Sequence, residues 1–331
     1  MPDLKDTARN IFHRTLAAMD IPSAIERQLG RAGTRIRLGE GWLDLAKFSR
    51  LRAVVFGKAG FATAEGLLQS LGSEFQIEGI LAGPVPPPRA LEGWKTFVCG
   101  HPIPDQESFR AAGAILELLG RCDENTLVFF LLSGGGSALV ELPLFPEVTL
   151  ADLQALHRAL VTCGAPIDEM NAVRKHFSAV KGGRLAAAAP GAMKVTLGVS
   201  DVPLGRESAL GSGPTLPDPS TVADVRRIVE QYALAALLPA SLRSRLAGGR
   251  LPETPKKGDP AFARAHFSLA LGMHQLFHQA HKVAEAAGCI TICDNTTDDW
   301  PVEKAASFLL GQLEALRSAH PDRPVCVIAD G

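Results

Sequence analysis

Several features that would assign a protein to a familiar class are missing from this sequence of 331 residues. None of the six cysteines forms a C-x-x-C pair, and the CITIC context of Cys289 and Cys293 indicates buried, reduced thiols. A formal net charge of −1 gives no reason to expect nucleic acid or a membrane surface as a partner. No apolar stretch is long enough to span a bilayer, and residues 1–20 carry charges throughout, unlike a signal peptide. We therefore expect a soluble, cytoplasmic protein.

The sequence motifs of well-known catalytic sites are also missing. There is no G-x-G-x-x-G dinucleotide fingerprint, no Walker A sequence, no H-E-x-x-H and no Ser-His-Asp order. The function must therefore be inferred from less familiar patterns.

The most informative stretch is LVFFLLSGGGSALV, residues 127–140. Its apolar run, 127–132, follows turn residues and predicts a strand buried on both faces. The run ends in Ser133, Gly134, Gly135, Gly136 and Ser137, and three consecutive glycines favour positive φ or a close approach of the backbone. Such a loop can hold an anion with its N–H groups. A tight turn without a ligand is the alternative.

Four expected strands of the first part of the chain end in a similar way. The strands 52–56, 96–99, 127–132 and 194–199 lead into Gly57-Lys58, Gly100-His101, Ser133-Gly134 and Ser200-Asp201. In a parallel, doubly wound sheet these ends lie along one edge, where ligands bind. A lysine, a histidine, a glycine loop and an aspartate on that edge suggest one composite site, although polar strand ends are common in α/β proteins.

A basic segment and one aspartate could add charged groups to this expected site. Arg174, Lys175, Lys181 and Arg184 either form a solvated helix face or supply positive charge to a phosphorylated or carboxylate ligand. Gly182-Gly183 should interrupt the helix between them. Asp201 could bind Mg²⁺ through a single carboxylate, or cap a turn.

The length of the chain and its composition predict two domains. A composition break at 247–260, AGGRLPETPKKGDP, favours a first domain of residues 1–245 and a second beginning at 246. We expect a doubly wound, largely parallel, Rossmann-like α/β sheet in the first. The expected strands 267–271, 289–293 and 325–329 alternate with helices and predict the opening of a second α/β domain.

Five motifs occurring in order give a resemblance to a known family. GKAG at 57–60, GHPIPDQES at 100–108, LLSGGGSAL at 131–139, NAVRKHFSAVKGGRLA at 171–186, and VSDVPLG with GSGPTLPDPST at 199–221 resemble the class II glycerate kinases. Members of that family phosphorylate D-glycerate on its 2-hydroxyl with ATP, and some carry the label hydroxypyruvate reductase. The resemblance covers residues 1–235 well and the remainder more weakly.

The resemblance implies a two-domain enzyme with its active site in an interdomain cleft, using ATP and Mg²⁺. It implies that Lys58 is catalytic and that the loop 133–137 faces the substrate and phosphate. The residues expected in the site are Lys58 and Asp201 as catalytic groups, Asp201 also as the metal ligand, and Ser133, Gly134, Gly135, Gly136, Ser137, Asn171, Arg174, Lys181, Arg184 and His101 as substrate- or phosphate-binding groups.

Two departures from the family pattern lead to further expectations. Family members continue past Gly331 into a glycine-rich motif that contains an arginine, and they have an asparagine-containing motif where this chain reads GMHQ, residues 272–275. We therefore expect the second domain to be incomplete, with an outer strand that is bare or covered by a neighbour; closure by the N-terminal helix or a second subunit is the alternative. A hydroxypyruvate reductase and a non-catalytic sugar-acid-binding protein remain alternative functions, and a homodimer is one arrangement that we consider.

Overall fold

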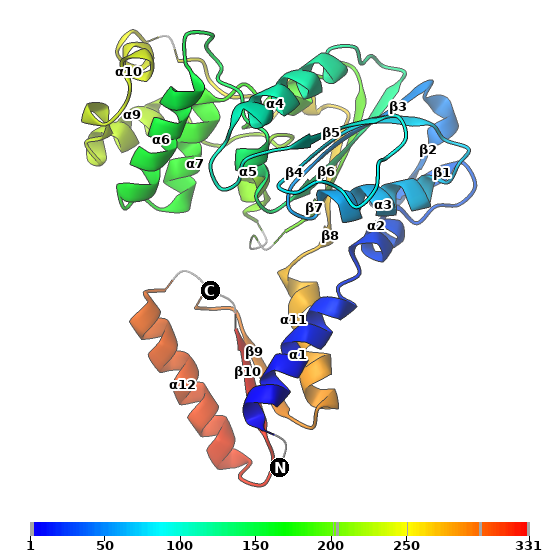
Figure 1. Ribbon diagram of the computed structural model, residues 1–331, viewed down its shortest axis with the longest axis vertical. Coiled ribbons are helices and arrows are strands. Elements are labelled where there is room, and N and C mark those ends of the chain that lie inside the picture. Colours follow the sequence, from blue (N-terminus) through cyan, green and yellow to red (C-terminus); the bar gives the residue numbers. More distant parts are fainter. Residues whose placement is uncertain (1–2, 201, 203–204, 250, 298–299, 330–331) are drawn as a thin grey trace. The chain divides into compact units, whose positions relative to one another are not determined.

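The chain forms two compact units (Figure 1). The computed structural model describes residues 3–200, 202, 205–249, 251–297 and 300–329. Residues 21–270 make up one unit, called here the larger unit. Residues 1–20 and 271–331 make up the other, the smaller unit.

A six-stranded sheet in the order β5-β4-β3-β6-β7-β8 forms the centre of the larger unit. The pairs β5·β4, β4·β3, β3·β6 and β6·β7 are all parallel. The strands are β3 (Arg50–Phe56), β4 (Ile77–Gly83), β5 (Trp94–Val98), β6 (Thr126–Ser133), β7 (Met193–Val199) and β8 (Ala265–Leu271). All residues of β6 are buried, as its apolar run predicts for a central parallel strand. The expected parallel α/β fold is confirmed.

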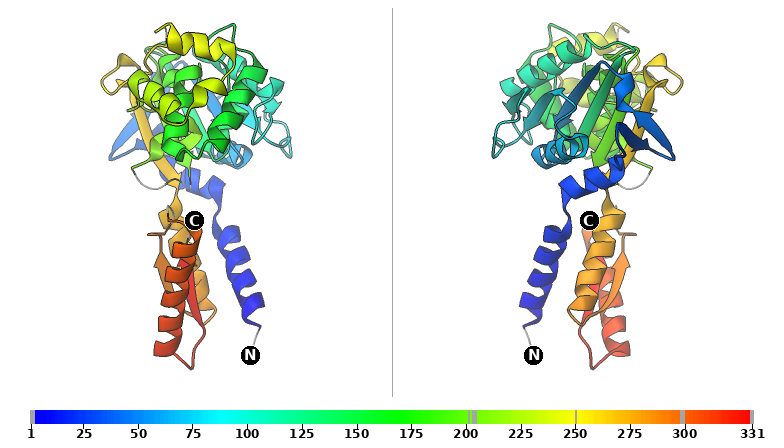
Figure 2. Two further views of the ribbon diagram at one scale, coloured as in Figure 1. Left: turned by 90° about the vertical axis from the view of Figure 1, so that its left-hand side faces the viewer. Right: turned by 90° about the vertical axis from the view of Figure 1, so that its right-hand side faces the viewer.

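Helices cover both faces of this sheet, as Figures 1 and 2 show for the larger unit. Because side chains alternate along a strand, β6 sends Val128, Phe130 and Leu132 to one apolar cluster and Leu127, Phe129 and Leu131 to another. The first cluster is completed by α4 (Gln106–Leu119), α5 (Gly136–Leu139) and α8 (Arg184–Ala187). The second is completed by α2 (Ile21–Leu29), α3 (Gly60–Leu71) and the hairpin β1 (Arg35–Leu38)–β2 (Gly41–Asp44), which continues into η1 (Leu45–Lys47). The fold is therefore doubly wound.

A small group of helices next to the sheet has its own apolar core. It consists of α6 (Leu150–Thr162), α7 (Ile167–Phe177), α9 (Val222–Gln231), η3 (Leu234–Ala236) and α10 (Ala240–Ala247). Thr149 and Asp152 form a capping box at the start of α6, and Asp105 caps α4 in the same way. The 3₁₀ segments η2 (Glu207–Ser212) and η4 (Pro260–Phe262) lie in the connections that follow β7 and α10.

The smaller unit contains α1 (Leu4–Ala18), α11 (Met273–Ala286), β9 (Ile290–Asp294), α12 (Val302–Ala319) and β10 (Val325–Ala329). The strands β9 and β10 pair in parallel. Ile11 of α1 packs with Val283, Ala284 and Cys289 in a small apolar cluster. Among the residues that the structure describes, no helix is both long and apolar enough to cross a membrane.

The division of the chain differs from the expected boundary at residues 245 and 246. The strand expected to open the second domain, 267–271, is instead β8 of the large sheet, next to β7. Just before β8, the Arg264 carbonyl accepts a hydrogen bond from the N–H of Lys194 in β7. The preceding segment is also part of the larger unit, because Leu251 lies in the helical core and Thr254 donates to Asp218 (2.9 Å). Helix α1, in contrast, belongs to the smaller unit. The composition break therefore marks a surface connection within one unit.

Candidate active site at the carboxyl edge of the sheet

The carboxyl ends of the parallel strands lie at one edge of the large sheet, as the sequence predicts. Phe56, the last residue of β3, is opposite Leu132 of β6, and Ser133 is opposite Val199 of β7. At β4 and β5, Gly83 is opposite Val98. The loops after these strands consequently leave the sheet at nearly the same level, which places their residues next to one another.

The loop after β3 is bonded to the loop after β6. The Lys58 N–H donates to the Gly134 carbonyl (2.9 Å), and the Ala59 N–H donates to Ser133 Oγ (3.0 Å). Gly57 has φ +132°, and a Cβ there would lie 2.0 Å from Ser133 Oγ. Only glycine can occupy this position without displacing the neighbouring loop. These contacts fix the position of the Lys58 backbone against the glycine loop.

Gly135 brings two of the expected site residues together. It has φ +87°, and a Cβ built on it would lie 3.0 Å from the His101 ring and 3.3 Å from Lys58 Cγ. Partial desolvation lowers the pKa of His101, and the positive charge of Lys58 lowers it further. Lys58 is exposed. The loop, the lysine and the histidine, which follow three of the four strand ends, therefore form one cluster.

Ser137 and Asn171 are linked through a residue that the sequence analysis did not single out. The hydroxyl groups of Ser137 and Ser212 are 2.8 Å apart, and Ser212 Oγ donates to Asn171 Oδ1 (3.3 Å). Ser212 and Asn171 are both buried. The chain of hydrogen bonds therefore joins the glycine loop to α7 through the end of η2.

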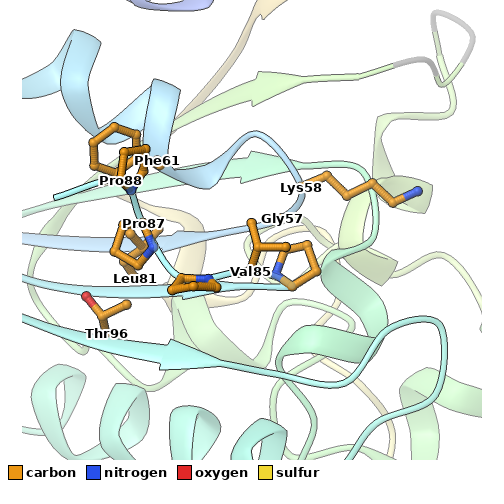
Figure 3. Close-up of a pocket in the computed structure, with 11 residues that line it drawn as sticks. Gly57, Lys58, Phe61, Leu81, Val85, Pro87, Pro88 and Thr96 are labelled. Atoms are coloured by element: carbon orange, nitrogen blue, oxygen red, sulfur yellow. The ribbon is translucent and has the colours of Figure 1, made fainter.

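Figure 3 shows a hollow of about 50 Å³ next to Lys58, lined by Gly57, Phe61, Leu81 and a run of prolines. The Lys58 side chain points away from Phe61 and from the prolines. A hollow of this size has room for a few water molecules only. This volume is far below that of small-molecule sites.

Lys181 lies in the interior, paired with Glu141. Its side chain is 1% exposed, as is that of Glu141, and the two form an ion pair. Ser178 Oγ also donates to Glu141 (2.6 Å), and His157 Nε2 is 3.6 Å from the same carboxylate. Glu141 follows the glycine loop and α5 closely in the chain, so the pair attaches this segment to the segment before Gly182.

Two opposing effects set the ionisation of Glu141. Its burial alone would raise its pKa, but the charge of Lys181 and the hydrogen bonds from His157 and Lys181 outweigh burial and lower the pKa to about 2. Burial lowers the pKa of Lys181, against the attraction of Glu141. The positive charge of Lys181 is thus matched by a carboxylate inside the protein.

The other basic residues of this segment do not form a solvated helix face. Lys175 is buried and its Nζ is 3.2 Å from Asp218. Desolvation lowers the pKa of Arg174 and of Arg184, both half-buried. Within the described residues, the Nε of each arginine has no hydrogen-bond partner, although an Arg184 Nη donates to the Glu253 carbonyl (3.5 Å). The structure does not place the four cations at one point, and the binding roles of Arg174, Lys181 and Arg184 stay predictions.

Asp201, the expected Mg²⁺ ligand, lies outside the described residues. Within the described ranges, no group of three or more His, Cys, Asp or Glu side chains could hold a metal ion. The metal role of Asp201 stays a prediction.

Glu141, Asp218 and Ser212 are buried polar residues, bonded to expected site residues or to their neighbours, that sequence reasoning missed. Glu141 stands alone among apolar residues in ALVELPLF, and an isolated carboxylate in such a run signals a buried partner. Asp218 in PDPST resembles a turn residue, so its sequence context carries no comparable signal.

The fold defines an α/β protein whose candidate ligand site lies at the loops that follow the carboxyl ends of a parallel sheet. The family described as "Domain of unknown function (DUF4147)" matches residues 7–247, and the chain belongs to this family. The resemblance to the class II glycerate kinases is confirmed by individual relatives.

A D-glycerate 2-kinase of Thermotoga maritima is 32% identical over 283 residues, which are 86% of this chain and 65% of that protein. A protein of Agrobacterium vitis with the provisional name hydroxypyruvate reductase is 40% identical over 223 residues, 66% of this chain and 49% of that one. The crystal structure of a glycerate kinase from Thermotoga maritima superimposes with a TM-score of 0.78 at 29% identity, covering 99% of this chain and 74% of that structure. The chain thus spans about half to two thirds of the length of these two curated relatives.

Proposed function

We propose that the protein transfers the γ-phosphoryl group of ATP to the 2-hydroxyl of D-glycerate. The observation that carries the proposal is the cluster at Gly135, where the backbone of the glycine loop, the Lys58 side chain and the His101 ring meet. The similarity to the D-glycerate 2-kinase of Thermotoga maritima supports the choice of substrate and of phosphate donor.

Phosphoryl transfer requires mainly that the reactants are positioned and that negative charge is neutralised. The bond from the γ-phosphorus to the β-phosphate oxygen breaks, a bond to the 2-hydroxyl oxygen forms, and the hydroxyl proton is released. Lys58, exposed and held at its backbone by Gly134, would stabilise the charge that grows on the transferred group. The N–H groups at Gly135 and Gly136 would bind an anionic oxygen.

The proposal includes Mg²⁺ as the ion that neutralises the phosphates of ATP. Among the expected site residues, the carboxylate of Asp201 is the group whose chemistry fits that ion. The cytoplasmic location stays a prediction as well.

The name of the Agrobacterium vitis relative makes a hydroxypyruvate reductase the alternative. The loop after β6 has no G-x-G-x-x-G sequence, which argues against a dinucleotide pyrophosphate at that position. A sugar-acid-binding protein without turnover is the other alternative.

A coupled assay on the full-length protein separates these functions. With ATP, Mg²⁺ and D-glycerate we expect ADP and 2-phosphoglycerate in equal amounts, and no NADH oxidation with hydroxypyruvate. Hydroxypyruvate-dependent NADH oxidation without ATP turnover would contradict the kinase function and favour the reductase. Binding of glycerate in calorimetry, with neither reaction detected, would identify a sugar-acid-binding protein without turnover.

A further inference from the structure

A second and larger cavity, of about 350 Å³, lies between α7 and two connecting segments of the larger unit. One helical face of α7 forms a wall, through Asp168, Asn171 and Lys175. The other walls are formed around the start of η2, by Gly205, Arg206, Ser208 and Ala209, and by residues 218–220.

The cavity contains a buried, fixed cation. Lys175 lines the cavity but is only 5% exposed, and its Nζ is held 3.2 Å from Asp218. Asp218 is itself fixed by hydrogen bonds from Thr254 Oγ1 (2.9 Å) and Ser220 Oγ (2.9 Å). Burial alone would raise the pKa of Asp218, but the charge of Lys175 and these hydroxyl groups outweigh burial and lower it. An ammonium group has three donors, so Lys175 can bind Asp218 and still donate to a ligand.

Two further charges of opposite sign line the cavity and are exposed: Arg206 and Asp168. Ser208 and Asn171 add a hydroxyl and an amide group to the lining. These lining groups are suited to a small molecule that carries one carboxylate and several hydroxyl groups. The cations can bind the carboxylate, and the amide and the hydroxyl can bind the hydroxyl groups.

The cavity is connected to the glycine loop. Asn171 lines the cavity, and its Oδ1 accepts a hydrogen bond from Ser212 Oγ, which lies 2.8 Å from Ser137 Oγ. A ligand bound against Asn171 would therefore be positioned relative to the loop on which Lys58 and His101 converge.

We propose that this cavity binds the acceptor acid, with its carboxylate on Lys175 and Arg206 and its hydroxyl groups toward Asn171 and Ser208. The proposal rests on the proposed kinase function for the identity of the acid. At about 350 Å³ the cavity is at the lower end of the range of small-molecule sites, which favours a short hydroxy acid over a nucleoside triphosphate. ATP would then occupy a different part of the site.

The test is titration calorimetry of D-glycerate and of glycerol into the full-length protein. Glycerol keeps the hydroxyl groups but lacks the carboxylate, and it should not bind measurably. Arg206→Gln should weaken glycerate binding about tenfold, the loss of one charge-assisted hydrogen bond. Asp168→Asn should tighten binding about twofold, because it removes a like charge. Both side chains are exposed, so neither change endangers the fold.

Arg243→Gln is the matched control, since Arg243 is exposed on α10 and does not line the cavity. It should bind glycerate like the wild type. Equal affinities of wild type, Arg206→Gln and Asp168→Asn would overturn the proposal, as would equal binding of glycerol and glycerate or no glycerate binding at all.

Steady-state kinetics separate this proposal from the kinase function. If ATP is consumed but Arg206→Gln leaves the KM for glycerate unchanged, the cavity is not the acid site and the kinase stands. An Arg206→Gln effect on the KM for ATP alone would also overturn the proposal. If no ATP is consumed, yet glycerate binds and Arg206→Gln weakens that binding, the cavity stands and the kinase fails.

Discussion

Lys58 and Lys181, both expected in the site from their motifs, have opposite environments. Lys58 is exposed at the sheet edge, whereas Lys181 is buried against Glu141. Sequence patterns could predict the segment of each lysine but not this difference, because a buried ion pair is defined by a partner distant in the chain. For Lys181 that partner is separated by the whole of α6 and α7.

Replacing Lys58 tests its catalytic role. Lys58→Ala should lower turnover by about two orders of magnitude or more, because a preorganised charge next to the transferring group is lost. The side chain is exposed, so the free energy of unfolding should change by less than about 0.5 kcal/mol. Normal turnover in the folded variant would remove Lys58 from the catalytic residues.

The same variant has a readout that does not depend on turnover. The charge of Lys58 contributes to the lowered pKa of His101, so Lys58→Ala should raise that pKa in an NMR titration. An unchanged titration would show that the two side chains do not face each other in solution.

The pair Glu141–Lys181 should show strong coupling in stability. Lys181→Met leaves a buried, ionised Glu141 and should cost about 3–5 kcal/mol in the free energy of unfolding. Glu141→Leu should be similarly harmful. The double variant should lose clearly less than the sum of the two, as measured by urea denaturation; simple additivity would argue against the buried pair.

Lowering the pH should weaken the contribution of Glu141 to the stability of the fold. Its folded-state pKa, about 2, lies below its ordinary value of 4.5, so its stabilisation is present above pH 4.5 and is lost as pH falls toward 2. The difference in unfolding free energy between the wild type and Glu141→Gln should therefore shrink over that window. A constant difference would indicate that Glu141 is already protonated in the folded protein.

At the scale of elements, neighbouring glycines of the loop have different requirements. A Cβ at Gly135 would be 3.0 Å from His101 at φ +87°, whereas a Cβ at Gly134 would have nothing within 4 Å. Of these two positions, the close approach or positive φ expected from three consecutive glycines holds at Gly135 and not at Gly134. Gly57 and Gly136 are tighter still, because a Cβ on them would lie 2.0 Å from Ser133 and 2.8 Å from Phe56.

Alanine at these two positions is a matched pair of tests. Gly135→Ala should abolish turnover, since it strains the backbone and displaces His101 next to Lys58. Gly134→Ala should retain most of the turnover. If Gly135→Ala folds and turns over substrate as fast as Gly134→Ala does, the loop is a turn without a ligand.

The strands were the most predictable part of the fold. The apolar run of β6 lies where the sequence places it. The sequence analysis did not identify α2, the hairpin β1–β2 or α10, which have short or mixed patterns. Short elements are stabilised by tertiary packing, as Ile25 and Ile36 are by the sheet, and that packing leaves little local signal.

For the whole molecule, the assignment of segments to units could not be predicted from composition. Helix α1 joins a unit whose other members follow residue 270, and β8 joins a sheet whose other strands end at Val199. Such long-range pairings depend on which apolar faces meet, and the proline- and glycine-rich connection at 247–260 only marks an exposed path.

The two units should differ in their resistance to opening. Every residue of β6 is buried, whereas no residue of β9 or β10 is. Hydrogen exchange should therefore be slowest in β6 and its neighbours, and clearly faster in β9 and β10. Equal protection of both sheets would indicate that the chain opens as one cooperative body.

The register of β3 against β6 has an evolutionary consequence. Phe56 is paired with Leu132, and two residues further along both segments the Lys58 N–H donates to the Gly134 carbonyl, so the two loops leave the sheet in step. One residue inserted in either strand would shift its loop by about 3.3 Å and turn its side chains to the opposite face. Lineages can therefore exchange the residues around Lys58 more freely than they can change their number.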